Sequence, residues 1–138
     1  EESGGFAFKG HIPERDGIWV AMILIEYIAK SGKSINGLIN EIYDIVGTFS
    51  FKRNDLKITE EKKLLILKMC HNNNFKSFQD LKVQNIETLD GYKFIFNKNE
   101  WVMIRPSGTE PILRIYAEGV NNDRVDEILE KTIKTILT

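Results

Sequence analysis

The stretch "EWVMIRPSGTEPILRIYAEG", residues 100–119, contains two apolar runs separated by a short polar connection. Pro106 lacks a backbone donor and therefore ends the first run as a strand, whereas Gly108 permits a tight or positive-φ backbone. The pattern predicts two strands, at 100–105 and 112–118, on either side of a loop.

The connection between these strands carries side chains that bind oxyanions. Arg105 offers a planar fork that can bind two phosphate oxygens, and Ser107 and Thr109 add hydroxyl donors. The N–H groups that follow Pro106 can converge into an anion-binding concavity, which Gly108 lets a ligand approach closely. Arg114 reaches the same place if the two strands pair antiparallel. The competing interpretation is a plain turn, because turns favour these residue types without any ligand.

The residues before this stretch extend the same pattern. "TFSFKRNDLKI" (48–58) alternates like a half-buried strand, and Thr59 followed by two glutamates starts a helix that runs to about His71. Asp90-Gly91 predicts a type I′ hairpin between "VQNIETL" and "YKFIF", and apolar positions from Val125 onward predict a final helix. We therefore expect an α+β domain, ordered β-α-β-β-β-α, in which two helices cover a four-stranded, mainly antiparallel sheet.

The first third of the chain has a different residue pattern, with a glycine-rich loop and two predicted helices. Residues 1–15 are glycine-rich and charged, Asp16 is a good N-cap for a helix from Gly17 to about Lys30, and Gly32 is a good stop. A second helix follows from Ser34 and ends at Gly47. The first helix is apolar on nearly every side and therefore requires cover on every side, which we expect from chain outside these residues. We expect residues 1–46 to be the end of an α/β domain and residues 47–138 to form a separate domain.

Composition narrows the class of protein. The 138 residues include 42% hydrophobic and 28% charged residues with a net charge of -1, as in a soluble globular protein. This balance gives no electrostatic case for a nucleic-acid or membrane partner, and the longest apolar run is too short to span a bilayer. We see no signal peptide and expect the cytoplasm. Cys70, the single cysteine, is expected to be a buried structural thiol.

Two further segments before the first helix carry candidate ligand groups. "EESGG", residues 1–5, offers carboxylates and a hydroxyl that suit sugar hydroxyls, although an acidic chain end looks the same. "HIPERDGI", residues 11–18, places His11 and Arg15 in a loop that can face a cleft. His11 is either a general acid or base or a hydrogen-bonding loop histidine.

In this order, "EESGG", "HIPERDGI" and "RPSGTEPILRIYAEG" resemble the α-D-phosphohexomutase superfamily, which includes phosphoglucomutases and phosphomannomutases. The resemblance covers nearly the whole chain and implies the end of the third domain and the complete fourth domain of a four-domain isomerase. It implies a hexose phosphate substrate, a phosphoserine and Mg²⁺. The serine and the magnesium loop belong to domains outside these residues, so we expect no catalysis and no metal site within the chain itself, with the missing N-terminal domains as its partners.

The resemblance also implies roles for single residues. Glu1 and Ser3 match positions that bind sugar hydroxyls, and Arg105, Ser107, Gly108, Thr109 and Arg114 match the clamp for the phosphate that is not transferred. Arg15 stands where relatives place a basic residue near the transferred phosphoryl group. Because arginine stays protonated, Arg15 suits charge stabilisation better than acid catalysis. "EES" favours glucose, or glucose and mannose together, as the sugar.

Two alternatives use the same domain without a mutase reaction. The first is an anion-binding or phosphopeptide-binding module, which would need neither "EESGG" nor "HIPERDGI". The second is a single-stranded nucleic-acid platform on which Tyr92, Phe94 and Phe96 stack bases. These three aromatic residues share one strand face, and we expect them in the core.

Overall fold

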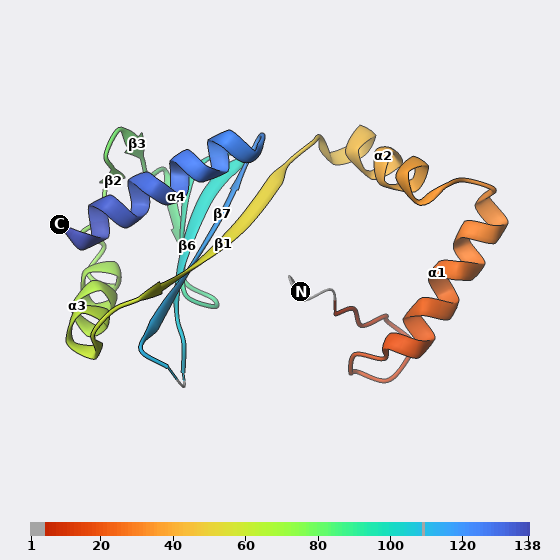
Figure 1. Cartoon of the computed structure of the whole chain (residues 1–138), viewed down its shortest axis with the longest axis horizontal. Helices are drawn as coiled ribbons and strands as arrows, with labels where there is room; N and C mark the ends of the chain where they lie inside the picture. Colours follow the sequence, from red (N-terminus) through yellow and green to blue (C-terminus); the bar gives the residue numbers. More distant parts are fainter. Residues whose placement is uncertain (1–4, 109) are drawn as a thin grey trace. The chain divides into compact units, whose positions relative to one another are not determined.

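The computed structural model describes residues 5–108 and 110–138. Within the chain, contacts separate two compact units, Glu1–Gly47 and Thr48–Thr138, called unit 1 and unit 2 below. Each unit is described by itself, with element labels as in Figure 1.

Unit 1 consists of a loop followed by the helices α1 (Gly17–Ser31) and α2 (Ile35–Val46). Asp16 caps α1 by accepting a hydrogen bond from the Trp19 N–H, and Ser34 caps α2 by accepting one from the Gly37 N–H. Helix α1 ends at Gly32, whose left-handed φ of 65° suits glycine. The predicted starts and ends of both helices are therefore confirmed.

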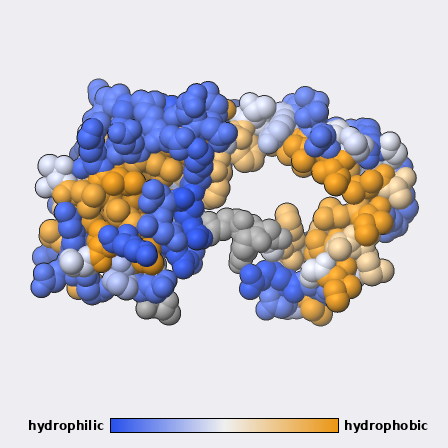
Figure 2. Space-filling model, in the orientation of Figure 1, coloured by the Kyte–Doolittle hydropathy of each residue, from blue (hydrophilic) through white to orange (hydrophobic). Residues whose placement is uncertain are grey.

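The helices of unit 1 bury none of their residues. Ile18 on α1 and Ile45 on α2 are 81% and 84% exposed, and hydrophobic atoms cover much of the surface of both helices in Figure 2. The all-round cover that the α1 sequence requires is thus not supplied by the described residues of unit 1. None of the helices within the described residues has the length and hydrophobicity needed to cross a membrane.

Unit 2 is built on a five-stranded antiparallel sheet in the order β1-β7-β6-β5-β4, with a separate two-stranded ribbon β2-β3. This arrangement confirms the α+β class. The sheet has five strands instead of the expected four. The edge strand β4, which pairs with β5, lies within the "VQNIETL" segment of the predicted hairpin, and the expected order β-α-β-β-β-α contained one strand too few. The elements are β1 (Ser50–Lys57), α3 (Glu60–His71), β2 (Ser77–Phe78), β3 (Leu81–Lys82), β4 (Asn85–Glu87), β5 (Tyr92–Asn97), β6 (Glu100–Pro106), β7 (Ile112–Gly119) and α4 (Asn122–Leu137).

The connection between β4 and β5 differs from the predicted type I′ turn. It comprises residues 88–91, and Gly91, with a φ of 109°, has the positive angle there, whereas Asp90 does not. A type I′ turn needs positive φ at both central residues, so this prediction is wrong. A side chain at Gly91 would also come within 2.9 Å of the Ile104 carbonyl oxygen, and the close approach to β6 therefore requires glycine.

The core of unit 2 lies between one face of the sheet and the helices α3 and α4. Alternate strand residues such as Val102, Ile104, Leu113 and Ile115 are fully buried against the inward faces of the helices. Phe94 and Phe96 belong to this core, as expected from the sequence. The ribbon adds Phe78, whose ring centroid lies 5.0 Å from that of Phe94.

Cys70 on α3 belongs to the same core and is completely buried. Burial disfavours the charged thiolate and raises the pKa of the Cys70 thiol to about 12. The prediction of a buried structural thiol is confirmed.

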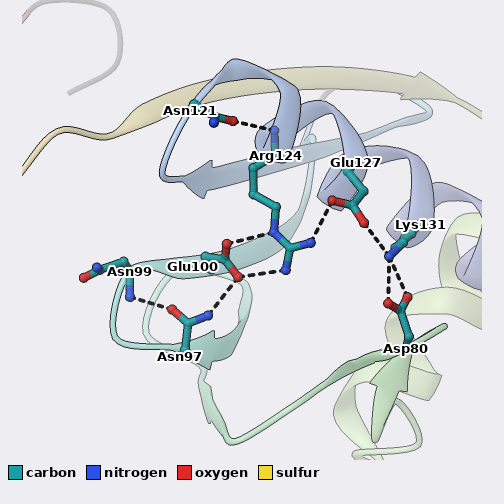
Figure 3. Close-up of polar contacts among 8 residues, drawn as sticks. All are labelled: Asp80, Asn97, Asn99, Glu100, Asn121, Arg124, Glu127 and Lys131. Carbon is teal, nitrogen blue, oxygen red and sulfur yellow. Dashed lines mark hydrogen bonds and ion pairs between the residues drawn. The ribbon is translucent and has the colours of Figure 1, made fainter.

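A polar network ties α4 to the sheet (Figure 3). Arg124 binds both carboxylate oxygens of Glu100, through Nε at 2.8 Å and through a terminal nitrogen at 2.9 Å. Glu127 joins Arg124 to Lys131, which also binds Asp80. The bidentate bond to Arg124 is the main reason that the pKa of Glu100 lies below its usual range.

Candidate functional site

The segment 105–111, called the 105–111 loop below, comprises the last two residues of β6 and the connection to β7. Its base is closed by a hydrogen bond from the Ser107 N–H to the Ile112 carbonyl oxygen, 3.0 Å long. A second hydrogen bond, of 2.8 Å, runs from the Ile112 N–H to the Glu110 carbonyl oxygen. Thr109, which the sequence assigns to the anion site, lies outside the described residues. The loop is therefore a short hairpin connection held to the sheet at both ends.

Arg105 and Arg114 lie directly opposite each other on β6 and β7. Their positions alternate with the buried residues Ile104, Leu113 and Ile115, so both arginines project from the face of the sheet that the helices do not cover. Like charges placed opposite each other on neighbouring strands repel. A bound anion between them would relieve this repulsion.

The nearby carboxylates compensate these two arginines unequally. Asp90 lies 3.3 Å from Nε of Arg105, while Asp55, the register partner of Arg114 on β1, is ion-paired with Arg53. Within residues 5–108 and 110–138, Arg114 forms no ion pair, and its buried Nε has no hydrogen-bond partner. The pair of arginines thus retains capacity for an anionic ligand.

The backbone of the loop offers fewer donors than the sequence suggests. Pro106 has no N–H, and the Ser107 N–H is used within the hairpin. Ser107 itself is only 5% exposed, so a ligand atom must insert between the loop residues to contact its hydroxyl. In the described part of the chain, no hydrogen bond uses the Gly108 N–H, and a side chain added at Gly108 would meet nothing within 4 Å. Gly108 therefore has both a donor and open space for a ligand.

A surface hollow of about 700 Å³ adjoins Arg105. Its walls come from the end of α3, the β4–β5 connection and the end of β6. This volume is within the usual range for small-molecule sites. The lining residues are His71, Asn73, Thr88, Asp90, Gly91, Tyr92, Arg105 and Pro106.

Lys63 on α3 is a residue of this region that the sequence interpretation did not include. Its Nζ lies 3.2 Å from the carbonyl oxygen of Ser107 and 3.2 Å from that of Glu110, and the side chain is only 10% exposed. The signal in the sequence was helical spacing, because Lys63, Ile66 and Cys70 form the buried stripe of α3.

The candidate residues of unit 1 fall into a second group. Glu1 and Ser3 lie outside the described residues, and Arg15 is an exposed side chain beside Glu14, with Nε 3.6 Å from the carboxylate. His11 Nε2 lies 2.9 Å from Asp16 Oδ2, and its ring stacks on Trp19 at 4.1 Å between centroids. His11 is thus a hydrogen-bonding loop histidine in this structure. The hydrogen bond from the Trp19 N–H is the main reason that the pKa of Asp16 is lowered.

Potential metal ligands do not form a cluster in residues 5–108 and 110–138. No group of three or more histidine, cysteine, aspartate or glutamate side chains is placed there to hold one ion. None of the described residues is therefore assigned to a metal.

Comparison with known families gives two matches along the chain. Residues 56–135 match the model of the phosphoglucomutase/phosphomannomutase C-terminal domain. Residues 1–46 match the model of the phosphoglucomutase/phosphomannomutase alpha/beta/alpha domain III. The first match includes the 105–111 loop, Arg114 and Lys63.

Curated relatives agree with these matches. A phosphoglucomutase/phosphomannomutase of Thermococcus kodakarensis is 35% identical over 99% of this chain and 27% of its own length. A phosphoglucosamine mutase of Methanococcus aeolicus is 32% identical over 99% of this chain and 28% of its own. A phosphopentomutase of Thermococcus kodakarensis is 27% identical over 73% of this chain and 22% of its own. The chain spans about a quarter of the length of these relatives, and it belongs to the phosphoglucomutase/phosphomannomutase family.

Proposed function

We propose that this chain is the sugar-phosphate recognition part of a phosphohexomutase, and that its 105–111 loop with Arg114 clamps the phosphate that is not transferred. The observation that carries the proposal is the pairing of Arg105 with Arg114 across β6 and β7. A phosphate monoester carries about -1.5 to -2 charges at pH 7. Such an anion offsets the repulsion between the arginines and accepts hydrogen bonds from both.

The Gly108 N–H and the Ser107 hydroxyl complete the proposed clamp. Each charge-assisted hydrogen bond contributes about 1.5–3 kcal/mol. One such bond does not offset the entropy that the ligand loses on binding, but several together do. Asp90 does not bind the phosphate in this proposal. Its ion pair orients the Arg105 guanidinium before the ligand binds. The adjoining hollow beside Arg105 leaves room for the sugar.

In the whole enzyme, we propose that hexose 1-phosphate and hexose 6-phosphate interconvert through a phosphoserine and a bisphosphate intermediate. The intermediate reorients during the reaction, so one fixed clamp must hold either phosphate while the other reacts. Positioning and electrostatic stabilisation then supply most of the catalysis. The phosphoserine and Mg²⁺ are assigned to parts of the enzyme other than these residues, which by themselves are expected to be inactive.

The residues of unit 1 complete the assignment. We propose that Glu1 and Ser3 bind sugar hydroxyls and that Arg15 stabilises charge near the transferred phosphoryl group. The sugar is proposed to be glucose, or glucose and mannose. A relative named phosphoglucomutase/phosphomannomutase supports this choice, although relatives named for other sugars match as well.

A phosphate titration of the 138-residue chain tests the clamp. In NMR spectra, inorganic phosphate or glucose 1-phosphate is expected to shift the Ser107 and Gly108 amides, with a dissociation constant on the order of 1 mM. Arg105→Ala and Arg114→Ala should each weaken binding by about tenfold or more. Lys98→Ala removes a charge from the turn between β5 and β6, at the other end of β6, and is the control. Unmoved signals at tens of millimolar ligand would contradict a preformed clamp.

The whole enzyme distinguishes a mutase from a non-catalytic anion module. Assays with glucose 1-phosphate and mannose 1-phosphate, side by side, give the sugar preference directly. Arg105→Ala should reduce kcat/KM for both substrates by at least about a hundredfold, since both phosphate orientations use the same clamp. Absence of activity, together with phosphate binding, would leave the anion module as the function.

A further inference from the structure

Lys63 places a positive charge beneath the 105–111 loop, on the side toward α3. Its ammonium has three acceptors at 3.2 Å, which are the carbonyl oxygens of Ser107 and Glu110 and a carboxylate oxygen of Glu60. Burying an ammonium costs free energy unless its three N–H donors are satisfied, and here they match three acceptors. Lysine is almost never buried to this extent unless it is paired, and two of the three partners of Lys63 belong to the 105–111 loop.

We propose that Lys63 is a positioning residue for anion binding, which turns the loop carbonyls inward and thereby directs the Gly108 N–H toward the ligand. This inference rests on the proposed function of the loop as a phosphate clamp. Lys63 itself does not touch the anion; it acts through the backbone that does.

The geometry of the peptide bond gives the reason. In a trans peptide, the C=O of one residue and the N–H of the next point in opposite directions. When the Ser107 carbonyl points at Lys63, the N–H of the exposed Gly108 must point away from Lys63. The second carbonyl, of Glu110, precedes Pro111, which has no N–H, so Lys63 orients a single donor and fixes the loop at a second point.

A neutral hydrogen-bond donor would hold these carbonyls less firmly. Hydrogen bonds from a charged donor are roughly twice as strong as neutral ones. The charge of Lys63 lies on the side of the Ser107–Gly108 peptide opposite to the Gly108 N–H, where it adds to the positive charge of Arg105 and Arg114 and is offset in part by Glu60. Both effects are lost when the side chain is replaced by an apolar one of similar length.

The first test uses the ligand-free 138-residue chain and three variants. Lys63→Met removes the charge and keeps the length, Lys63→Arg keeps a cation, and Lys68→Met removes an exposed lysine of the same helix as a matched control. We expect Lys63→Met alone to move the Gly108 amide signal and to lower its heteronuclear NOE. Methyl signals of Ile66 and Ile104 report whether the core is intact, and if Lys63→Met unfolds, Lys63→Gln, which removes the charge but remains polar, takes its place with the same expected results.

The second test titrates the same four proteins with inorganic phosphate. Lys63→Met should bind about tenfold more weakly or worse, Lys63→Arg within about threefold of the unsubstituted chain, and Lys68→Met unchanged. Binding by Lys63→Met at unsubstituted affinity would overturn the inference, as would Lys63→Arg binding as weakly as Lys63→Met. If the unsubstituted chain binds no phosphate, the proposed function fails, and the inference about Lys63 fails with it. The titration of the unsubstituted chain alone shows this, whereas the variants test the role of Lys63.

Discussion

Unit 1 and unit 2 form helices of similar regularity but bury very different amounts of hydrophobic surface. Helices α1 and α2 have no buried residue, whereas α4 buries five, among them Val125 and Ile128. Their polar contacts differ in the same way. The pairs His11–Asp16 and Glu26–Lys30 join residues five and four apart, while Lys52 and Asp126 are 74 apart.

This difference separates what shapes a helix from what stabilises it. Caps and stop signals act within a few residues and are satisfied equally well in both units. Most of the stability of a helix in a protein comes from packing its apolar face, and among the described residues only those of unit 2 provide such packing. We therefore expect cooperative unfolding in unit 2 and weak, local stability in unit 1.

Core truncation should give the largest contrast. Ile128→Ala in α4 should lower the free energy of unfolding of unit 2 by about 2–5 kcal/mol, because Ile128 is fully buried. The same change at Ile25 in α1, which is 66% exposed, should leave unit 2 unchanged. Urea unfolding followed at the indole NMR signals of Trp19 and Trp101 reports the two units separately. If both substitutions lowered the free energy of unfolding of unit 2 equally, the contrast between a packed unit 2 and an unpacked unit 1 would be wrong.

Removal of the charge on Glu100 should give the next largest effect. Glu100→Gln should destabilise unit 2 by about 1–3 kcal/mol at pH 7, because the bidentate bond to Arg124 loses its charge.

The same substitution should change the dependence of stability on pH. The pKa of Glu100 is lowered in the folded state, so its contribution is present above the unfolded pKa of about 4.3 and is lost as pH falls through the folded pKa. Acid unfolding of Glu100→Gln should therefore be less steep with pH than that of the unsubstituted chain. Identical pH profiles for the two proteins would exclude this role of Glu100.

Helix caps offer a medium-sized test. Asn121→Ala removes the side chain that accepts from the Arg124 N–H at the start of α4, and should cost unit 2 about 1 kcal/mol. Ser34→Ala removes the corresponding cap of α2 and should lower only the local helicity, read from carbon chemical shifts of residues 35–38. A cooperative loss of unit 1 structure after Ser34→Ala would contradict the expectation that unit 1 has only local stability.

Exposed ion pairs should give the smallest effects in both units. Lys30→Ala in α1 breaks an i,i+4 pair with Glu26. It should change the free energy of helix formation by no more than about 0.5 kcal/mol. Lys52→Ala breaks the long-range pair with Asp126 and should cost less than about 1 kcal/mol, since both side chains are solvated. Double-mutant cycles measure both couplings, and high salt should reduce them.

The sequence was sufficient for features that depend on near neighbours. The caps Asp16, Ser34 and Thr59 were predicted because capping is a contact over two or three residues. The antiparallel pairing that brings Arg105 and Arg114 together follows from the short connection between two strands. Local composition did not reveal the ribbon β2-β3, because two-residue strands have no periodicity to detect.

The contacts that the sequence missed are long-range ones. Lys63 stands next to other charged residues in "EEKK" and resembles a solvated lysine, yet it binds carbonyls 44 and 47 residues away. Similarly, the expected row of loop donors included Ser107, whose N–H is used by Ile112 instead. Which donors remain for a ligand is decided by the hairpin register, and residue types alone do not specify it.

The buried thiol of Cys70 has a practical consequence. Maleimides react with thiolates, and a completely buried cysteine with a pKa of about 12 presents almost none at neutral pH. Since the sequence has one cysteine, a new one at an exposed site such as Lys98 would be labelled selectively in the otherwise native chain. Adding a second at an exposed position of α1 would allow fluorescence energy transfer to measure the separation of the two units.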